Sequence, residues 1–329
     1  MSAQQHNIAN SQDIYKKISK FIPDAEWKIH APLIDKINKL KREKNAIILA
    51  HNYQTPEIYH GVADIAADSL ALAIEASKTS ADKIIMCGVH FMAETAKLMN
   101  PAKKVFLPDM EAGCSLASSI TGEDVRLLKQ KYPGVPVVSY VNTSADVKAE
   151  TDICCTSANA VKVVESLNVD KVIFLPDQYL ADYVAKNTKV KIIAWKGTCI
   201  VHEQFTEKEI KDIKTQNPGI KVIAHPECPP DVIAASDFAG STSGMIKYVK
   251  DNQPKKVMLV TECSMSDNVE ADNPNVSFIK PCNLCPYMKK INLEKILDCL
   301  ENDKNEIILD NKTIEAARKS VIRMTEIGR

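Results

Sequence analysis

The 329-residue sequence predicts an α/β protein with three pseudo-symmetric βαβαβα domains, each a three-layer αβα unit, around a central active-site cavity. Short continuous apolar runs alternate with longer amphipathic segments, a pattern typical of parallel sheets covered by helices. The runs fall into three sets of three with nearly constant spacing, which indicates a structural repeat of roughly 87 residues. Hydrophobic residues make up 45% of the chain and charged residues 26%, so the composition is globular and excludes a disordered chain.

The N-terminal segment and the repeats define the expected domains. Ile14, Ile18 and Ile22 recur at helical spacing, so helices are expected before the first sheet. The expected boundaries are an N-terminal tail with lead-in helices over 1–44 and repeats over 45–132, 133–218 and 219–329, the last including C-terminal helices.

Each repeat contributes three predicted strands, which are continuous apolar runs bounded by polar or turn-forming residues. The strands are expected at 46–50, 83–87 and 104–108 in the first repeat, at 135–141, 171–176 and 191–195 in the second, and at 221–225, 256–260 and 276–279 in the third. The segments between them have the amphipathic character of helices that cover a sheet.

Charge and hydropathy narrow the functional classes. Lys plus Arg and Asp plus Glu both number 42, so the formal net charge is zero. A nucleic-acid-binding domain usually has a basic excess, so no nucleic-acid partner is expected. The apolar runs are far shorter than the ~20 residues of a membrane-spanning helix, and the polar start lacks the layout of a signal peptide. We therefore expect no membrane association and a cytoplasmic location.

Polar side chains follow the first strand of each repeat. In open α/β sheets ligands bind beyond the carboxyl ends of the strands. One polar loop residue usually bonds only to nearby backbone, but three equivalent sets favour a binding or catalytic site. The sets are His51-Asn52-Tyr53, Tyr140-Val141-Asn142 and His225-Pro226-Glu227, and their first members are 89 and 85 residues apart.

A hydroxyl side chain occurs at a matching position in each repeat. Ser69, Ser157 and Thr242 are 88 and 85 residues apart, and each comes just before a helical segment. Each is therefore expected to cap a helix, which could be its whole role. Helix N-termini also bind phosphate and carboxylate, so three of them would suit a small ligand with several anionic groups.

Three of the ten cysteines follow the same register. Cys114, Cys199 and Cys285 are 85 and 86 residues apart, each shortly after a third strand. With ten cysteines, a third falls within one residue of a given projected position by chance roughly one time in ten, and many triples are available, so the progression alone proves little. The strand and hydroxyl registers agree with it and give it weight. Three thiolates favour zinc or an iron–sulfur cluster. A structural zinc prefers four ligands in two CxxC pairs, and only Cys282 and Cys285 form one, so an iron–sulfur cluster with an open iron is favoured.

Two further cysteines leave alternatives open. Cys87, at the end of a predicted strand, is the reserve candidate for the first ligand. Cys282 could pair with Cys285 under oxidation, which would remove that ligand from the metal.

Many short motifs, in order, resemble the quinolinate synthase family of iron–sulfur enzymes. The resemblance extends from Ala46 to about Met288. The motifs are HNYQ (51–54), ADS (67–69), GVHFMAE (88–94), LPD (107–109), AGCSLA (112–117), YVNTSA (140–145), CTSANA (155–160), GTCIVH (197–202), HPEC (225–228), GSTSGM (240–245) and CNLCPYM (282–288).

The resemblance implies the three-domain fold and a [4Fe–4S] cluster held by Cys114, Cys199 and Cys285. It also implies a transferase of NAD biosynthesis that joins iminoaspartate to dihydroxyacetone phosphate and releases phosphate and two waters. The open iron would act as a Lewis acid. The implied functional partner is L-aspartate oxidase, which would supply iminoaspartate.

The resemblance also assigns roles to the polar residues at the strand ends. Tyr53 and Glu227, with His51 and His225 beside them, are the proton-transfer candidates. The residues expected to bind substrate are His51, Ser69, Tyr140, Asn142, Ser157, His225, Glu227, Ser241 and Thr242. Carboxylate or phosphate would be held by Ser69, Tyr140, Asn142, Ser157, Ser241 and Thr242.

Two other functions fit the same architecture. The first is a different three-domain iron–sulfur enzyme, such as a reductive dehydroxylase of isoprenoid synthesis or a diphthamide-forming enzyme. The second is a small-anion sensor with a structural cluster, which the density of titratable residues at the strand ends argues against.

Overall fold

The structure is a computed structural model that describes residues 4–5 and 11–328. The chain divides into two compact units. Unit 1 consists of Met1–Gly113, Glu262–Pro274 and Leu284–Ile308, and unit 2 consists of Cys114–Thr261, Asn275–Asn283 and Leu309–Arg329. Part of the predicted N-terminal tail, residues 1–3 and 6–10, lies outside the described residues. The domain boundaries expected from the repeat remain a prediction.

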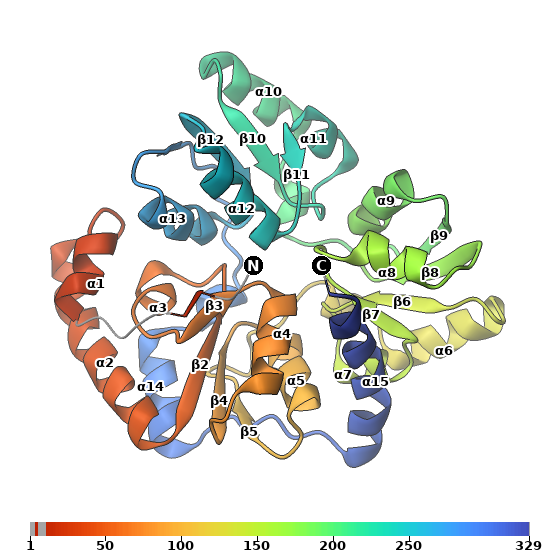
Figure 1. Cartoon of the computed structure of the whole chain (residues 1–329), viewed down its shortest axis with the longest axis horizontal. Helices are drawn as coiled ribbons and strands as arrows, with labels where there is room; N and C mark the ends of the chain where they lie inside the picture. Colours follow the sequence, from red (N-terminus) through yellow and green to blue (C-terminus); the bar gives the residue numbers. More distant parts are fainter. Residues whose placement is uncertain (1–3, 6–10, 329) are drawn as a thin grey trace. The chain divides into compact units, whose positions relative to one another are not determined.

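Unit 1 contains one sheet, and its strand order is β1-β3-β2-β4-β5. All its neighbouring strands are parallel except β1, which pairs antiparallel with β3. Figure 1 shows these strands in red and orange, with α4 and α5 beside β4. The strands are β1 (Gln4–Gln5), β2 (Ala46–His51), β3 (Ile65–Ala67), β4 (Lys83–Cys87) and β5 (Lys104–Phe106). The helices are α1 (Ser11–Ile18), α2 (Asp24–Glu43), α3 (Pro56–Tyr59), α4 (Ser69–Lys78), α5 (His90–Met99), α13 (Cys263–Asp272), the 3₁₀ turn η3 (Met288–Lys290) and α14 (Leu293–Asn302).

Unit 2 contains two parallel sheets with the orders β7-β6-β8-β9 and β11-β10-β12-β13. The strands are β6 (Val137–Tyr140), β7 (Ile153–Cys155), β8 (Lys171–Leu175), β9 (Lys191–Ala194), β10 (Lys221–Ala224), β11 (Phe238–Ala239), β12 (Lys256–Val260) and β13 (Ser277–Phe278). The helices are η1 (Ala117–Ser119), α6 (Gly122–Lys131), α7 (Ala145–Ala149), α8 (Ala160–Ser166), α9 (Gln178–Asn187), η2 (His202–Gln204), α10 (Glu207–Gln216), α11 (Pro230–Ala235), α12 (Thr242–Asn252) and α15 (Asn311–Ile327).

The predicted fold class is confirmed: three parallel sheets flanked by helices occur in the chain, and every predicted strand is present. The prediction of three strands per repeat was incomplete, because β1 adds an edge strand to the sheet of unit 1 and each of the three repeats has a further short strand that pairs with its first strand. These strands, β3, β7 and β11, have only two or three residues, and their sequences are IAA, ICC and FA. They are too short to give an apolar run that stands out from a loop.

The central strands are buried because helices cover both faces of each parallel sheet. Four of the five residues of β4, β8 and β12 are buried, and in each case the first residue, a lysine, is more exposed. In the β6–β8 sheet, Val137 and Leu175 belong to one apolar core cluster. None of the helices in the described part of the chain is both long enough and apolar enough to cross a bilayer.

The shared strand order determines where a ligand can bind. In each sheet the strand that begins the repeat, β2, β6 or β10, lies between the next two strands along the chain, as in β7-β6-β8. The chain therefore runs from β6 toward one edge of its sheet, to β7, and from β8 toward the other edge, to β9, so a crevice opens between the carboxyl ends of β6 and β8. All three sets of predicted polar residues follow a first strand, β2, β6 or β10, as expected.

Candidate functional site

The two sheets of unit 2 bring their strand-end residues into one hydrogen-bonded cluster. Glu227, which follows β10, is buried, with a relative exposure of 4%. The hydroxyl of Tyr140, at the end of β6, donates a 2.5 Å hydrogen bond to Glu227 Oε1. His225 Nε2 lies 3.2 Å from Ser157 Oγ, which follows β7. Four predicted site residues from the two sheets of unit 2 are thus brought together.

His202 joins this cluster and was not predicted as a site residue. Its Nδ1 atom lies 2.9 Å from Glu227 Oε2 and 3.2 Å from Cys199 Sγ. Its Nε2 atom lies 2.9 Å from Thr261 Oγ1, and its ring stacks on that of His225 with the centroids 4.8 Å apart. His202 therefore links a predicted catalytic carboxylate to a predicted metal-ligating thiol.

The surroundings of Glu227 favour its ionised form. Burial by itself would raise the pKa of this carboxyl group, but His202 and His225 and the hydrogen bonds from His202 and Tyr140 together lower the pKa below its ordinary value. Glu227 is therefore a carboxylate near neutral pH and can accept a proton.

Asp177 is a second buried acid beside this cluster. Its Oδ1 accepts a 2.7 Å hydrogen bond from the backbone N–H of Leu180 and so caps α9. Its Oδ2 is buried with no hydrogen-bond partner among the described residues. Burial raises the pKa of Asp177, and the charge of Glu227 raises it further. Two acids with pKa values shifted in opposite directions are a common feature of proton-transfer sites.

The loops that carry Cys114 and Cys199 are held together by Ser115. Its hydroxyl donates to the Thr198 carbonyl at 3.0 Å and accepts from the Ile200 N–H at 3.2 Å. Gly197 allows this approach, because a Cβ atom there would lie 2.6 Å from both the Pro176 carbonyl oxygen and Ser119 Oγ. The glycine of the GTC motif is therefore required by close packing at the end of β8.

Solvent exposure separates the predicted metal-ligating cysteines from the other free cysteines. Among the free cysteines of the described chain, Cys114, Cys199 and Cys285 are partly exposed, and the others are buried. Cys87, the reserve ligand, is fully buried, as is expected of a core residue. Cys285 is a free thiol and so is not paired with Cys282.

The electrostatics of these thiols favour a bound cation. Burial raises the pKa of Cys199, and the charges of Glu227 and Cys114 raise it further. Burial also raises the pKa of Cys285. Without a cation both groups remain thiols, whereas a metal ion stabilises the thiolate that coordinates it. The donor atoms of Cys199, His202 and Glu227 all lie within 4.8 Å of one another and could hold a metal ion.

The strand-end residues of unit 1 form a separate arrangement. The rings of His51 and Tyr53 meet edge to face, with centroids 4.6 Å apart, and the Tyr53 N–H donates to His51 Nδ1. Asn268 of α13 donates from its side chain to the carbonyls of Asn52 and Gln54. The loop that carries Tyr53 is therefore fixed by α13, a helix that is more than 200 residues away in the sequence.

A buried ion pair connects this loop to Cys285. Glu262 is fully buried and lies 3.0 Å from Lys289 Nζ. Its carboxylate also accepts from the backbone N–H groups of Cys285, at 3.4 Å, and of Ser264, at 2.9 Å. Lys289 Nζ donates to the Tyr53 carbonyl at 2.8 Å and to Ser264 Oγ at 2.7 Å. One ion pair thus positions the backbones of a predicted catalytic residue and of a predicted metal ligand.

We expect Lys289→Met to lower the free energy of unfolding by about 3 kcal/mol, because it leaves the buried carboxylate of Glu262 without its cation. Urea unfolding of the purified chain measures this loss. Lys290→Met is the matched control, because Lys290 forms an exposed ion pair with Glu111 and should have no measurable effect. Equal unfolding midpoints for the two variants would contradict the prediction. The double variant Glu262→Gln with Lys289→Met should recover part of the lost free energy of unfolding, because it removes the buried charge as well as its cation.

The predicted capping role of the three hydroxyl residues was wrong. Asp68 caps α4 by accepting from the Ala71 N–H, so Ser69 is already the first helical residue. The residue before α8 is Asn159, two positions after Ser157. The prediction failed because each helix begins one or two residues from the expected position. At α4 and α12 the residue before the true start takes the capping role, whereas Asn159 makes no side-chain capping bond to α8.

The GSTSG segment shows the same one-residue difference. Ser241 caps α12 by accepting from the Gly244 N–H at 3.2 Å, so Thr242 is the first helical residue. Both residues are buried.

Asn142 Oδ1, after β6, is buried and has no hydrogen-bond partner among the described residues. A ligand that donates a hydrogen bond would satisfy this oxygen.

Several residues of the clusters in the two units were missed by the sequence analysis. His202 lies three residues after Cys199, in a C-x-x-H arrangement within the quoted GTCIVH motif, and that spacing could have indicated it. Asp177 and Glu262 are 85 residues apart, so the repeat register pairs them. No motif or repeat spacing indicates Ser115, Thr261 or Lys289, because only tertiary contacts bring each of them to its cluster.

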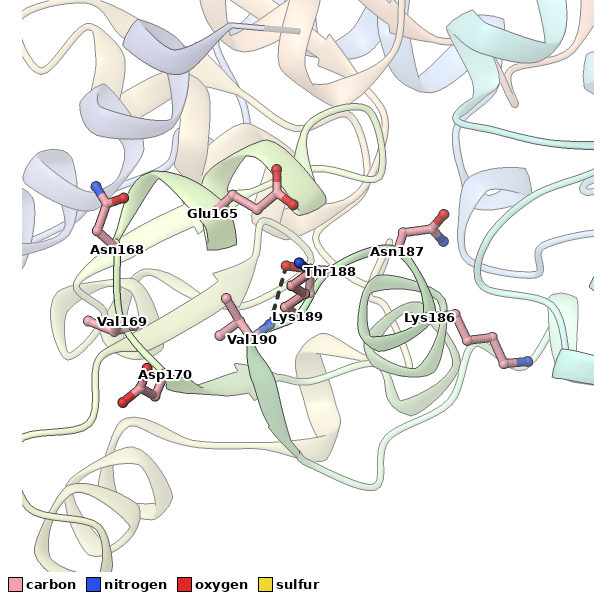
Figure 2. Close-up of a pocket in the computed structure, with 9 residues that line it drawn as sticks. All are labelled: Glu165, Asn168, Val169, Asp170, Lys186, Asn187, Thr188, Lys189 and Val190. Atoms are coloured by element: carbon pink, nitrogen blue, oxygen red, sulfur yellow. Dashed lines mark hydrogen bonds between the residues drawn. The ribbon is translucent and has the colours of Figure 1, made fainter.

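Figure 2 shows a surface pocket of unit 2 that is distinct from these clusters. Asn168, Val169 and Asp170 precede β8, while Thr188, Lys189 and Val190 precede β9, and Glu165, Lys186 and Asn187 complete the lining. The pocket therefore lies at the amino ends of these strands, opposite the end that carries Tyr140 and Asp177. It contains no predicted site residue.

Taken together, these features define an α/β protein of three parallel sheets in which carboxylate, imidazole and thiol groups meet at the carboxyl ends of the strands. Residues 35–326 match the family described as quinolinate synthetase A protein, or NadA. The chain therefore belongs to the quinolinate synthetase A family, as the motifs predicted, and is an enzyme of that family.

Curated relatives carry the corresponding name. The chain is 60% identical over 314 residues to a quinolinate synthase of Sinorhizobium fredii, with 95% of this chain and 88% of the relative covered. It is 56% identical over 323 residues to a quinolinate synthase of Caulobacter vibrioides, with 97% and 88% covered. It is 61% identical over 294 residues to a quinolinate synthase of Xylella fastidiosa, with 89% and 87% covered.

Proposed function

We propose that the chain is a quinolinate synthase of NAD biosynthesis, which joins iminoaspartate to dihydroxyacetone phosphate to give quinolinate, phosphate and two waters. The observation that carries the proposal is the state of the cysteines: the three that share the repeat register are the partly exposed ones among the free cysteines of the described chain. The family match supports it and disfavours the reductive dehydroxylase, the diphthamide-forming enzyme and the anion sensor.

We further propose that Cys114, Cys199 and Cys285 together hold one [4Fe–4S] cluster. Three cysteine ligands suit such a cluster and leave one iron without a protein ligand. When bound, this iron would supply a Lewis acid that polarises a substrate oxygen. The partial exposure of these three cysteines supports the proposal, because an incoming cluster must reach the thiols, and the other free cysteines of the described chain are buried.

The proton transfers are assigned to the chain's own residues. Glu227 is ionised, so its carboxylate would take a proton from the carbon that is deprotonated before condensation. His202 holds Oε2 and Tyr140 holds Oε1, so the carboxylate is oriented before substrate arrives. Tyr53, with His51 beside it, would transfer protons during loss of water, and His225 would assist Glu227.

Substrate carboxylate and phosphate groups would bind to the remaining polar residues of the site. Asn142 and Ser157 are the first candidates. The amide NH₂ of Asn142 would donate to an anionic group while its unpartnered Oδ1 accepts from a substrate N–H or hydroxyl, and the Ser157 hydroxyl faces His225. The residues with the same proposed role are His51, Ser69, Tyr140, His225, Ser241 and Thr242, whereas Glu227 would contact the substrate through the C–H group that it deprotonates. L-Aspartate oxidase is the proposed functional partner, because its reaction would supply iminoaspartate, and the cytoplasm is the proposed location, because thiolate ligands persist in a reducing compartment.

The test is anaerobic incubation of the iron- and sulfide-reconstituted chain with iminoaspartate and dihydroxyacetone phosphate. We expect quinolinate and phosphate to appear in equal amounts, which follows from the atom balance of the reaction. Omission of either substrate is the control and should give no product. Absence of quinolinate from a chain that carries a full complement of iron and sulfide would overturn the proposal.

A further inference from the structure

The side chain of His202 lies between two groups that bind metal ions as anions, the thiol of Cys199 and the carboxylate of Glu227. Its Nδ1 atom is 3.2 Å from Cys199 Sγ and 2.9 Å from Glu227 Oε2. The relative exposures of His202 and Glu227 are 1% and 4%, so both are almost completely removed from solvent. One sulfur, one imidazole nitrogen and one carboxylate oxygen therefore converge in the protein interior, all within 4.8 Å of one another.

Hydrogen bonds outside this triad orient two of its members. Thr261 Oγ1 lies 2.9 Å from His202 Nε2 and can accept the proton of that nitrogen. Without an ion, Nδ1 shares a proton with the Glu227 carboxylate. When a metal ion displaces that proton, the imidazole keeps its proton on Nε2, facing Thr261, and the Nδ1 lone pair becomes available to the ion. The Tyr140 hydroxyl donates to Glu227 Oε1 and leaves Oε2 directed at His202. Metal-binding histidines and carboxylates are usually held by such outer partners.

We propose that the chain, when it carries no iron–sulfur cluster, binds one Zn²⁺ ion through Cys199 Sγ, His202 Nδ1 and the Glu227 carboxylate. Sulfur, nitrogen and oxygen donors of these types are those that zinc prefers, and three protein ligands leave a fourth position for water. Binding releases the thiol proton of Cys199 and the proton that His202 shares with Glu227, and it involves no change of oxidation state. One thiolate and one carboxylate then balance the 2+ charge of the ion, so the buried site is neutral.

The distances allow this ion with a small local movement. Zinc–sulfur and zinc–nitrogen bonds of ~2.3 and ~2.0 Å in a tetrahedron place the ligand atoms about 3.3–3.6 Å apart. The observed separations of 3.2 and 2.9 Å are a few tenths of an ångström shorter, as hydrogen-bonded atoms are. The third separation, between Cys199 Sγ and the Glu227 carboxylate, is at most 4.8 Å, and Cys199 is partly exposed, so side-chain movements would bring the three atoms to the separations that the ion needs.

Cys199 Sγ cannot bind the zinc ion and the iron–sulfur cluster at the same time. This part rests on the proposed function, in which Cys199 binds the iron–sulfur cluster. A zinc ion at Cys199, His202 and Glu227 would occupy one cluster ligand and also the carboxylate proposed as the general base. Zinc would therefore block cluster assembly and occupy the proton-transfer group until it is removed.

The first test is an anaerobic zinc titration of the full chain, freed of iron by chelation, against a chromophoric competitor. We expect one ion to bind, and X-ray absorption at the zinc edge to show one sulfur with two or three nitrogen or oxygen neighbours. Three sulfur neighbours would indicate a three-cysteine site and would overturn the inference, as would absence of binding.

Variants separate the proposed ligands from the other cysteines. His202→Asn should weaken zinc affinity at least ~100-fold, and Thr261→Val, which removes only the outer partner, should weaken it about 10- to 100-fold. Cys285→Ser and Cys299→Ser are the controls and should bind zinc as the parent does. Circular dichroism and thermal unfolding check that each variant is folded. Parental affinity in both His202→Asn and Thr261→Val, or lost affinity in Cys285→Ser, would overturn the inference.

The second test is cluster reconstitution with iron and sulfide after zinc loading. We expect reconstitution to fail until zinc is chelated, and to proceed in zinc-treated His202→Asn. If a full cluster assembles while zinc stays bound, mutual exclusion is wrong and Cys199 is not a cluster ligand, which would overturn that part of the proposed function. The zinc site itself is judged separately by the titration and the absorption spectrum.

Discussion

Replacement of Cys114, Cys199 or Cys285 by alanine is expected to abolish the [4Fe–4S] cluster and, with it, quinolinate formation. A cluster held by three cysteines has no spare protein ligand, so the loss of one thiolate exposes a second iron and the cluster dissociates. Iron and sulfide analysis and the visible absorption spectrum of each reconstituted variant measure the outcome. Activity should fall to the level of the iron-free chain.

Cys299→Ala is the matched control for the cluster prediction. Cys299 is buried in α14, and its thiol donates to the Lys304 carbonyl, so its loss should affect stability but not the iron content. A full cluster in Cys114→Ala would contradict the prediction and transfer the first ligand to Cys87. The structure makes that outcome unexpected, because Cys87 is fully buried and desolvation raises its pKa.

Glu227→Gln is expected to reduce turnover at least ~100-fold while the cluster and substrate binding are retained. The substitution preserves the size of the side chain but removes the group that accepts a proton. The Tyr140 hydroxyl and His202 both approach this side chain, and an amide can accept only on its oxygen, so one of these contacts is also weakened. Single-turnover quinolinate formation, measured beside an iron and sulfide assay, gives the result.

Glu203→Gln is the control for this substitution. Glu203 is exposed and adjoins His202 in η2, so it tests the same chemical change at the edge of the cluster. We expect its turnover to match that of the parent chain. Near-parental turnover in Glu227→Gln would remove Glu227 from the proton transfers and assign them to His51 or His225.

The repeat and the strands were predictable because they depend on local sequence. Buried parallel strands need continuous apolar runs, and runs such as Ala46–His51 and Lys256–Val260 are visible without any tertiary information. The short strands β3, β7 and β11 were not predictable, because two or three residues become a strand only by pairing with a neighbour that is already in place.

The helix starts show the same division between local and tertiary information. The sequence placed a hydroxyl near each start, but Asp68 and Ser241 cap α4 and α12 instead of Ser69 and Thr242. Capping depends on which side-chain oxygen reaches a free N–H group, so a shift of one residue changes the capping residue. The spacing between equivalent residues of the repeats varies from 85 to 88 residues, so it cannot locate a helix start to within one residue.

By itself the sequence determined the fold class, the family and the cysteine register, because apolar runs, motifs and spacing are properties of the chain. The tertiary structure decided which groups meet. It brought His202 between Cys199 and Glu227. It also buried Glu262 against Lys289 in unit 1, where the pair contacts the backbones of Tyr53 and Cys285. These contacts join segments far apart in the sequence, and the charge on a carboxylate depends on its neighbours in space, so neither could be deduced from the order of the residues.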